Sequence, residues 1–282
     1  MNVGELLKTF LDDYHSESAE LDVQLLLAHA MGRPRSWISA HLDAPLTPPQ
    51  LDSATQAFAQ LQAGTPLPYI LGHWEFYGLD LDITPDVLIP RPETELLVEK
   101  AIQWLTNRPE ARSVADIGTG SGAIAISIAK HISDVQILAT DISPNALQVA
   151  KRNAEKHEVA ERIQFAECDL LPNSEFKIQN SKFDLICANL PYIPTETLHG
   201  LPVYGREPTL ALDGGTDGLD LVRRLLELAP DWLAPRGMML LEIEASEGAK
   251  ALSLAYDAFE EVNLKLKKDL AGNDRLLIVR PL

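Results

Sequence analysis

Short apolar runs alternate with segments of helical periodicity from residue 113 to the end of the chain, and this alternation constrains the fold most. The predicted strands are residues 114–117, 135–139, 163–165, 183–188, 238–243, 262–266 and 275–279. The predicted helices among them are residues 123–131, 144–155, 219–233 and 249–259. Strands that alternate with helices pair in parallel, with helices on both faces of the sheet. We therefore predict an α/β fold built on an open, mostly parallel sheet.

The first 62 residues instead carry apolar residues at helical spacing. The stripes are Leu6, Leu7, Phe10 and Leu11; Leu21, Leu25, Leu26, Ala28 and His29; and Leu51, Ala54, Phe58 and Leu61. Glycine and proline residues between the stripes, from Gly32 to Pro49, mark the places where helices end. This region predicts a small helical bundle.

Residues 65–92 differ from both regions. Residues 74–77 and 79–83 have strand-like alternation on either side of Gly78, which predicts a β-hairpin, and the prolines that follow indicate a connector. We therefore divide the chain into three parts. They are an N-terminal helical domain (residues 1–66), a hairpin and linker (residues 67–91) and a larger domain (residues 92–282).

The charge of the chain is strongly negative. The net charge is −17, and residues 1–90 hold twelve Asp and Glu against three Lys and Arg. A nucleic-acid-binding surface carries a basic stripe, and the sequence shows none. We therefore do not expect nucleic acid to be the main partner.

Targeting and redox features are few. No apolar run is long enough to span a membrane, and the first 18 residues lack the regions of a secretory signal. The two cysteines, Cys168 and Cys187, are too few for a disulfide framework and lack zinc-ligand spacing. We expect a monomer of the reducing cytoplasm, without a metal site.

A glycine-rich loop follows the first predicted strand of the alternating region. Gly118, Gly120 and Gly122 lie in the turn before the next helix, where glycine allows a tight bend and close approach of a ligand to the main chain. Asp141 ends the second strand about twenty residues later, where a carboxylate can accept hydrogen bonds from both hydroxyls of a ribose. The loop and the acid together predict a cofactor that contains a nucleoside.

The spacing of this loop discriminates among such cofactors. The dinucleotide pattern is G-x-G-x-x-G, with a pyrophosphate at the helix N-terminus, whereas this loop reads G-x-G-x-G after an acid, Asp116. A carboxylate near the cofactor suits a cationic amino-acid end better than a diphosphate. The loop therefore favours S-adenosylmethionine over NAD.

The fourth predicted strand ends in Asn189-Leu190-Pro191-Tyr192, at the edge of the sheet where open α/β folds bind ligands. Methyl transfer to an amide or exocyclic amine requires the nitrogen to pyramidalise, so that its lone pair points at the methyl group. Two acceptors against its N–H bonds favour this geometry: the Asn189 side-chain oxygen and the Leu190 carbonyl, since Pro191 holds residue 190 extended. The Tyr192 ring can stack on the planar group. The tetrapeptide therefore predicts N-methylation through positioning and electrostatics.

Four further stretches, together with these motifs, resemble the release-factor glutamine methyltransferases over nearly the whole chain. They are PYILGHWEFYGL (residues 68–79), VLIPRPETELLVE (87–99), REPTLALDGGTDGLD (206–220) and DLAGNDRLLIVR (269–280). This family methylates the side-chain amide nitrogen, N5, of the glutamine in the Gly-Gly-Gln motif of class 1 peptide chain release factors. The resemblance implies this activity here, with a release factor as protein partner.

The resemblance also implies a fold and a set of site residues. The fold would be a class I S-adenosylmethionine-dependent methyltransferase domain, Rossmann-like, preceded by a small helical domain that helps to grip the release factor. The implied cofactor-binding residues are Gly118, Thr119, Gly120, Ser121, Gly122, Asp141, Leu170 and Asn189, with Leu170 against the adenine. The implied catalytic and substrate-binding residues are Asn189, Leu190, Pro191 and Tyr192, with Arg91, Pro92 and Glu93 bordering the pocket.

The chain departs from the family pattern at three places. Leu190 replaces the first proline of the usual Asn-Pro-Pro-Tyr, although it supplies the same carbonyl with less rigidity. Leu170 stands where relatives often have an aromatic residue, which would weaken stacking on adenine. Glu244 and Glu247 stand where relatives tend to have glycine and glutamine, and nothing in the sequence explains them.

Several alternatives stay open at this point. Asn-Leu-Pro-Tyr also resembles the motif of ribosomal RNA adenine dimethyltransferases, so N6-adenine methylation of nucleic acid fits the tetrapeptide, although the acidic N-terminal region counts against it. A glutamine of another protein, such as a ribosomal protein, is a second possible acceptor. A cofactor-binding scaffold without activity is a third reading, which the intact tetrapeptide disfavours.

Overall fold

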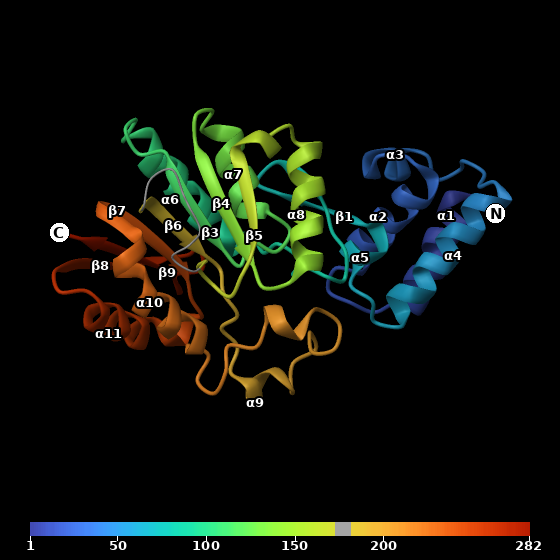
Figure 1. Ribbon diagram of the computed structural model, residues 1–282. Coiled ribbons are helices and arrows are strands. Elements are labelled where there is room, and N and C mark those ends of the chain that lie inside the picture. Colours follow the sequence, from blue (N-terminus) through green and yellow to red (C-terminus); the bar gives the residue numbers. More distant parts are fainter. Residues whose placement is uncertain (173–181) are drawn as a thin grey trace. The chain divides into compact units, whose positions relative to one another are not determined.

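The computed structural model describes residues 1–172 and 182–282. The chain divides into two compact units, which we call the helical unit (Met1–His73) and the sheet unit (Trp74–Leu282). Figure 1 labels their elements in chain order.

The helical unit confirms the predicted bundle. Its elements are α1 (Val3–Asp13), α2 (Ala19–Met31), α3 (Arg35–Ala40), α4 (Pro48–Gln62) and α5 (Leu67–Leu71). A capping box starts α1: the Asn2 side chain accepts from the Glu5 amide at 2.8 Å, and the Glu5 carboxylate accepts from the Asn2 amide at 2.9 Å. Phe10 of α1 and Phe58 of α4 stack with ring centroids 3.9 Å apart, so these two helices share one core.

The buried face of α2 differs from the predicted stripe. The helix buries Val23, Leu26 and Leu27, whereas Leu21 and His29 of the predicted stripe are exposed. The segment is apolar on more than one face, so its periodicity defines a helix without defining the side that packs. The predicted helix is therefore confirmed, and its predicted face is wrong at these two positions.

A hairpin and a short helical turn open the second part of the chain. Strands β1 (His73–Phe76) and β2 (Leu79–Asp82) pair around Tyr77 and Gly78, which both have positive φ, 52° and 74°. Two successive residues of positive φ are typical of a two-residue hairpin turn, so the hairpin predicted around Gly78 is confirmed. The 3₁₀ turn η1 (Pro92–Thr94) then leads into α6 (Glu95–Thr106).

The described part of the sheet unit contains a seven-stranded sheet in the order β5-β4-β3-β6-β7-β9-β8. Its strands are β3 (Ser113–Ile117), β4 (Gln136–Asp141), β5 (Ile163–Glu167), β6 (Phe183–Ala188), β7 (Leu233–Glu242), β8 (Val262–Lys268) and β9 (Asp274–Pro281). From β5 to β7 the neighbours pair in parallel, and β9 runs antiparallel to both β7 and β8. The predicted, mostly parallel sheet is confirmed.

Helices cover both faces of this sheet, as predicted (Figure 1). Helices α6, α7 (Ala123–His131) and α8 (Pro144–Lys156) pack side by side on one face. Helices α10 (Asp220–Trp232) and α11 (Gly248–Ala258) pack together over the other face, where Ala115 and Ile117 of β3 enter their core. Side chains alternate along a strand, so Asp116 points to the face that carries α7.

Parallel pairing brings the carboxyl ends of β3, β4 and β6 together at one edge of the sheet. Ile117 at the end of β3 pairs with Thr140 of β4 on one side and with Ala188 of β6 on the other. The strand order reverses between β3 and β6, because the chain winds outward in opposite directions from this pair. Open sheets bind ligands outside the carboxyl ends of the strands at such a switch point.

The Asp116 carboxyl group connects β3 to α7 and is fully buried. Its Oδ2 accepts from the Thr119 hydroxyl at 2.6 Å and from the Ala125 amide, in the first turn of α7, at 3.2 Å. Its Oδ1 is buried without a hydrogen-bond partner among the described residues. Burial raises the pKa of Asp116 from an ordinary value of 3.8 to about 6, against the lowering effect of those two hydrogen bonds.

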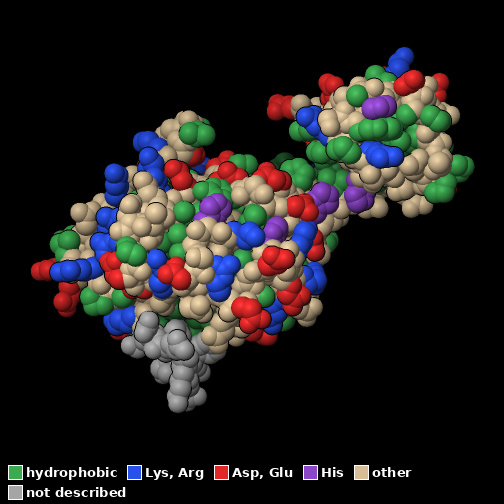
Figure 2. Space-filling view, turned by 90° about the horizontal axis from the view of Figure 1, so that it is seen from above, with side chains coloured by type: hydrophobic (Ala, Val, Ile, Leu, Met, Phe, Trp, Pro, Cys, Tyr) green, Lys and Arg blue, Asp and Glu red, His purple; other side chains and the backbone are tan. Residues whose placement is uncertain are grey.

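Charged side chains of both signs are mixed over the visible face of the sheet unit (Figure 2). Within the described ranges, no helix combines the length and the apolar character needed to cross a membrane.

The raised pKa of Asp116 predicts a pH dependence of folding. Below about pH 3 this carboxyl is protonated in both states; as the pH rises, the unfolded chain ionises first, so stability is lost until the folded carboxyl ionises near pH 6. Each pKa unit corresponds to about 1.4 kcal/mol, so the free energy of unfolding of wild type should fall by about 3 kcal/mol relative to Asp116→Asn between about pH 3 and pH 7.

Urea titrations of both proteins across this range measure the effect. Asp257→Asn, on the exposed side of α11, serves as the control because it makes the same charge change at the surface. A constant difference between wild type and Asp116→Asn at every pH would contradict the expectation.

Candidate active site

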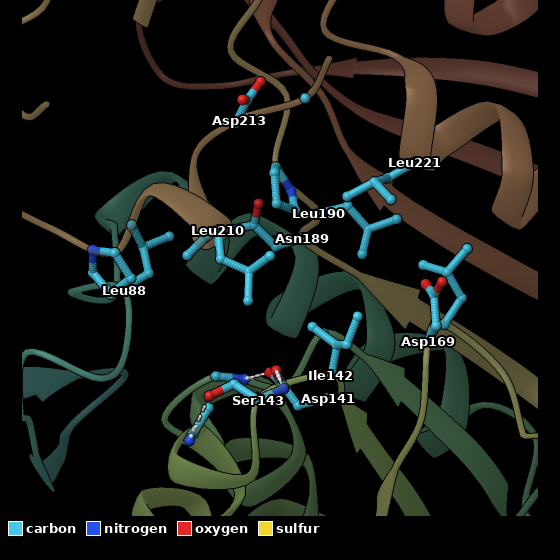
Figure 3. Close-up of a pocket in the computed structure, with 18 of the residues that line it drawn as sticks. Leu88, Asp141, Ile142, Ser143, Asp169, Asn189, Leu190, Leu210, Asp213 and Leu221 are labelled. Carbon is cyan, nitrogen blue, oxygen red and sulfur yellow. Dashed lines mark hydrogen bonds between the residues drawn. The ribbon is translucent and has the colours of Figure 1, made fainter. Parts of the chain in front are cut away.

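A cavity of about 660 Å³ opens at the switch point, within the range of small-molecule sites. Figure 3 shows Leu88 and Leu210 on one side of it and Asp169 and Leu221 on the other. The described lining residues come from the end of β4, from the loops after β3, β4, β5 and β6, from residues 86–88, 208–211 and 213–215, and from the starts of α8 and α10. Among the predicted site residues, the lining includes Gly118, Gly120, Asp141, Leu170, Asn189, Leu190 and Pro191.

The glycine loop is tied to Asp141. The Gly120 amide donates to Asp141 Oδ2 and the Ser143 amide to Oδ1, both at 2.9 Å. Gly118 and Gly120 have φ of 72° and 55°, a conformation that glycine adopts without a steric cost. Burial raises the pKa of Asp141 above its ordinary value, while the backbone hydrogen bonds lower it. A carboxylate has about four acceptor sites, so Asp141 retains capacity to accept a further hydrogen bond from a ligand.

Leu190 packs directly over the glycine loop. A Cβ atom on Gly118 would lie 3.1 Å from Leu190 Cδ2, so the contact leaves little room for a side chain at residue 118. Leu190 itself is almost fully buried. Leucine in place of proline at residue 190 thus puts a packed apolar side chain between the glycine loop and the loop after β6.

The Asn189 side chain is held by its nitrogen. Asn189 Nδ2 donates to Thr94 Oγ1 at 2.9 Å, and Thr94 is 4% exposed. Within the described ranges, no donor is bonded to Asn189 Oδ1 or to the Leu190 carbonyl oxygen. The two acceptors that the sequence predicted for a substrate nitrogen are therefore available, on residues that line the cavity (Figure 3).

Tyr192 is not among the described residues that line the cavity. Its hydroxyl donates to Glu242 Oε1 at 3.4 Å, and burial raises the pKa of Tyr192. Glu242 ends β7 and is 2% exposed. Stacking of Tyr192 on a substrate stays a prediction.

The segment at residues 208–219 packs on the backbone that follows Asn189. The Gly214 amide donates to the Ile193 carbonyl at 2.8 Å, and the Ile193 amide donates to the Leu212 carbonyl at 3.0 Å. A Cβ atom on Gly214 would lie 2.7 Å from the Tyr192 Cα, so only glycine fits there. This close approach is the physical reason for glycine at residues 214 and 218.

Arg91 forms an ion pair with Glu207 at 2.6 Å, and it does not line the described cavity. Glu207 is 9% exposed and also accepts from the Ile89 amide at 3.2 Å. The pair fastens residues 88–91 to the loop at residues 206–213, and each segment supplies a leucine to the cavity, Leu88 and Leu210. The predicted contact of Arg91 with substrate stays a prediction.

The other loop residues predicted to bind cofactor lie outside the described lining. Thr119 and Ser121 are buried, and Thr119 donates to Asp116. A Cβ atom on Gly122 would lie 2.8 Å from Ile126 Cδ1, so this glycine permits close packing within and beside α7. Asp116, which the sequence suggested for a cationic ligand, also lies outside the lining because its carboxyl faces α7. A direct contact of Thr119, Ser121 or Gly122 with cofactor stays a prediction.

The described lining of the cavity is acidic. Its aspartates are Asp86, Asp141, Asp169, Asp213 and Asp220. Arg224, the one arginine in the described lining, donates to Asp169 at 2.7 Å and so adds no free positive charge. Such a lining suits a cationic ligand and opposes a diphosphate.

Sequence reasoning missed several residues that build this site. Thr94 and Glu242 hold Asn189 and Tyr192, Glu207 holds Arg91, and Ile142 lines the cavity directly after Asp141. Glu242 carried a usable signal, because an acid at the end of an apolar strand is expected to have a specific partner. Thr94 carried none, since a threonine at the start of a helix is common as a cap.

Comparisons with known families match both parts of the chain. The family model described as PrmC N-terminal domain matches residues 5–72, and the model described as Methyltransferase domain matches residues 110–242. With the strand order above, the second match confirms the predicted methyltransferase fold.

Similar proteins were found along nearly the whole chain. The release factor glutamine methyltransferase of Moorella thermoacetica is 42% identical over 263 residues, which cover 93% of this chain and 91% of that protein. The release factor glutamine methyltransferase of Bordetella pertussis is 39% identical over 274 residues, 96% of this chain and 97% of that protein. Among solved structures, the N-terminal domain of human METTL16 in complex with SAH shares the fold, with a TM-score of 0.51 at 17% identity over 73% of this chain and 76% of that chain. The chain therefore belongs to the release factor glutamine methyltransferase family.

Proposed function

We propose that this protein transfers a methyl group from S-adenosylmethionine to N5 of the glutamine in the Gly-Gly-Gln motif of class 1 peptide chain release factors. The observation that carries the proposal is the Asn189 side chain, held by its nitrogen so that Oδ1 is left as an acceptor in the cavity formed by the glycine loop and Asp141. The names of relatives at 42% and 39% identity support the choice of acceptor. A substrate of the translation machinery would place the enzyme in the cytoplasm, where it would act as a monomer.

The cavity fits S-adenosylmethionine in charge and in shape. When bound, this cofactor supplies an electrophilic methyl group on a positively charged sulfur, beside a cationic amino-acid end. The aspartates of the lining favour such a ligand, and the bare main chain at Gly118 and Gly120 allows it to approach closely. We assign the ribose hydroxyls to Asp141, which retains acceptor capacity, and the adenine to the wall that includes Ile142 and Leu170.

Asn189 and Leu190 prepare the substrate nitrogen for transfer. A glutamine amide is planar and its lone pair is delocalised, so the nitrogen is a poor nucleophile. Hydrogen bonds from its two N–H groups to Asn189 Oδ1 and to the Leu190 carbonyl favour a tetrahedral nitrogen with a localised lone pair. Both acceptors are fixed before the substrate arrives, so little reorganisation is needed in the transition state.

The same two acceptors stabilise the charge that develops. The nitrogen gains positive character as its bond to carbon forms, and neutral acceptors at hydrogen-bond distance favour that change. The nitrogen then loses one proton to solvent, which restores a neutral, N-methylated amide.

We also propose that residues 1–66 dock the release factor, with residues 67–91 as the link to the methyltransferase domain at residues 92–282. A flexible loop that carries the target glutamine needs binding energy from contacts away from the reacting atoms. The family model that matches residues 5–72 supports a dedicated role for this region in the family.

Mass spectrometry of an unmethylated class 1 release factor tests the proposed function. Incubation with this protein and S-adenosylmethionine should add one methyl group, mapped by peptide fragmentation to the glutamine of Gly-Gly-Gln. A release factor with alanine in place of that glutamine is the matched control. Label in ribosomal RNA, included in a parallel reaction, without label in the release factor would overturn the assignment of substrate.

Replacement of Asn189 by alanine should lower kcat for the release factor by about 100-fold or more, because one of the two acceptors is lost. The Kd for S-adenosylhomocysteine, measured by calorimetry, should change by less than about threefold, since Asp141 and the glycine loop remain. Asn263→Ala, on the exposed side of β8, should match wild type in both measurements. Near-normal kcat in Asn189→Ala would show that the side chain does not act on the substrate nitrogen.

Deletion of residues 1–65 should raise KM for the release factor by about tenfold or more and leave cofactor affinity within about threefold of wild type. Circular dichroism and a cooperative thermal transition establish that the truncated protein is folded. Loss of cofactor binding in a folded truncation would contradict the proposed division between docking and catalysis.

A further inference from the structure

A buried carboxylate lies behind the candidate active site, and the mechanism above does not use it. Glu242 is 2% exposed, and its Oε2 has no hydrogen-bond partner in the part of the chain that the structure describes. Its Oε1 accepts from the Tyr192 hydroxyl at 3.4 Å. Burial of an acid is costly unless it is paired, so this residue requires a reason of its own.

Thr94 connects this carboxylate to Asn189. Thr94 is 4% exposed, and its Oγ1 accepts from Asn189 Nδ2 at 2.9 Å. The Thr94 hydroxyl lowers the pKa of Glu242 against the effect of burial, as a donor directed at this carboxylate does. Side chains from η1, from β7 and from the loop after β6 thus lie in series, with Thr94 between Asn189 and Glu242.

The chemistry of these three side chains determines which of them donates and which accepts. A carboxylate only accepts, so the single hydroxyl proton of Thr94 is directed to Glu242. The Thr94 oxygen is then left as an acceptor, and the Asn189 amide must present its NH₂ group to it. The two ends of an amide have almost the same shape, so packing alone does not select between them. The charge on Glu242 therefore decides which end of Asn189 faces the cavity.

We propose that Glu242 is a positioning residue that acts through Thr94 to orient the Asn189 amide, so that Oδ1 and not Nδ2 meets the substrate nitrogen. This inference rests on the proposed function, because it explains how Asn189 Oδ1, the acceptor for the substrate nitrogen, is oriented. An inverted Asn189 would direct an N–H group at the substrate N–H group, which opposes binding in the reactive geometry.

The donor and acceptor roles of Thr94 and Asn189 depend on the ionisation of Glu242. Burial raises the pKa of Glu242 from 4.5 to about 7; the Thr94 and Tyr192 hydroxyls and the charge of Arg275 on β9 oppose that rise, and Glu93 adds to it. A protonated carboxyl is itself a donor, so Thr94 is no longer forced to donate toward it. The preference of Asn189 for one orientation should therefore weaken as the pH falls through about 7.

Steady-state kinetics of the full chain on a release factor tests the proposal first. Thr94→Val keeps the shape of the side chain and removes the link, so kcat should fall by about tenfold while KM and the Kd for S-adenosylhomocysteine stay within about threefold. Thr94→Ser should restore at least half of the wild-type kcat. Glu242→Gln should lower kcat and remove the decline in rate that is expected of wild type below about pH 7. Glu244→Gln is the matched control, because the Glu244 carboxylate bonds to Ser246 and not to Thr94 or Asn189.

Nuclear magnetic resonance provides a test that does not need turnover. The side-chain NH₂ signals of Asn189, assigned by their absence from Asn189→Ala, should shift in wild type as the pH passes through about 7 and should not shift in Glu242→Gln.

Two results would overturn the proposal: unchanged kcat in Thr94→Val, or the same acidic decline in Glu242→Gln and wild type, which would assign that decline to another buried acid such as Asp116. Failure of the proposed function is distinguishable, because wild type would then transfer no methyl group to the release factor at any pH.

Discussion

Parallel pairing of β3 with β6 is the interaction on which the rest of the site depends. Ile117 pairs with Ala188, so the glycine loop and Asn189 emerge side by side at one edge of the sheet. The opposite winding of the chain on the two sides of this pair leaves a crevice there, and α10 and the loop at residues 208–219 help to close it. Backbone hydrogen bonds of the sheet, rather than their own side chains, therefore place the glycine loop and the Asn189-Leu190 segment.

Successive layers of contact then fix the residues of the candidate site. Gly120 and Ser143 amides hold Asp141, Leu190 fills the space over Gly118, and Thr94 holds the Asn189 nitrogen. Behind these lie buried acids, Asp116 and Glu242, whose pKa values are raised by burial. Stability is reduced at neutral pH by such acids, so their retention is consistent with a role in shaping the site rather than in holding the fold together.

Much of the fold could be predicted from periodicity, because strands and helices of the sheet unit differ clearly in length and spacing. The mostly parallel pairing and the place of Asn189 at the sheet edge could be predicted from the alternation, whereas the order of the strands was not predicted. The packed face of α2 could not be predicted, since Leu21 and Val23 are equally apolar and only tertiary contacts choose between them. Thr94 could not be found either, because its partner, Asn189, is 95 residues away in sequence. Asp116 was expected near the cofactor, yet its carboxyl faces α7, as a strand-end acid before a helix can serve either purpose.

A structure of the full chain with S-adenosylhomocysteine and a Gly-Gly-Gln peptide tests the central claim most directly. The claim is that Asn189 Oδ1 and the Leu190 carbonyl grip the substrate nitrogen from opposite N–H bonds. The predicted result is a glutamine nitrogen within about 3 Å of both oxygens, with Asn189 Nδ2 still donating to Thr94. A glutamine nitrogen bound by other groups, or an Asn189 that turns its NH₂ group to the peptide, would contradict the claim.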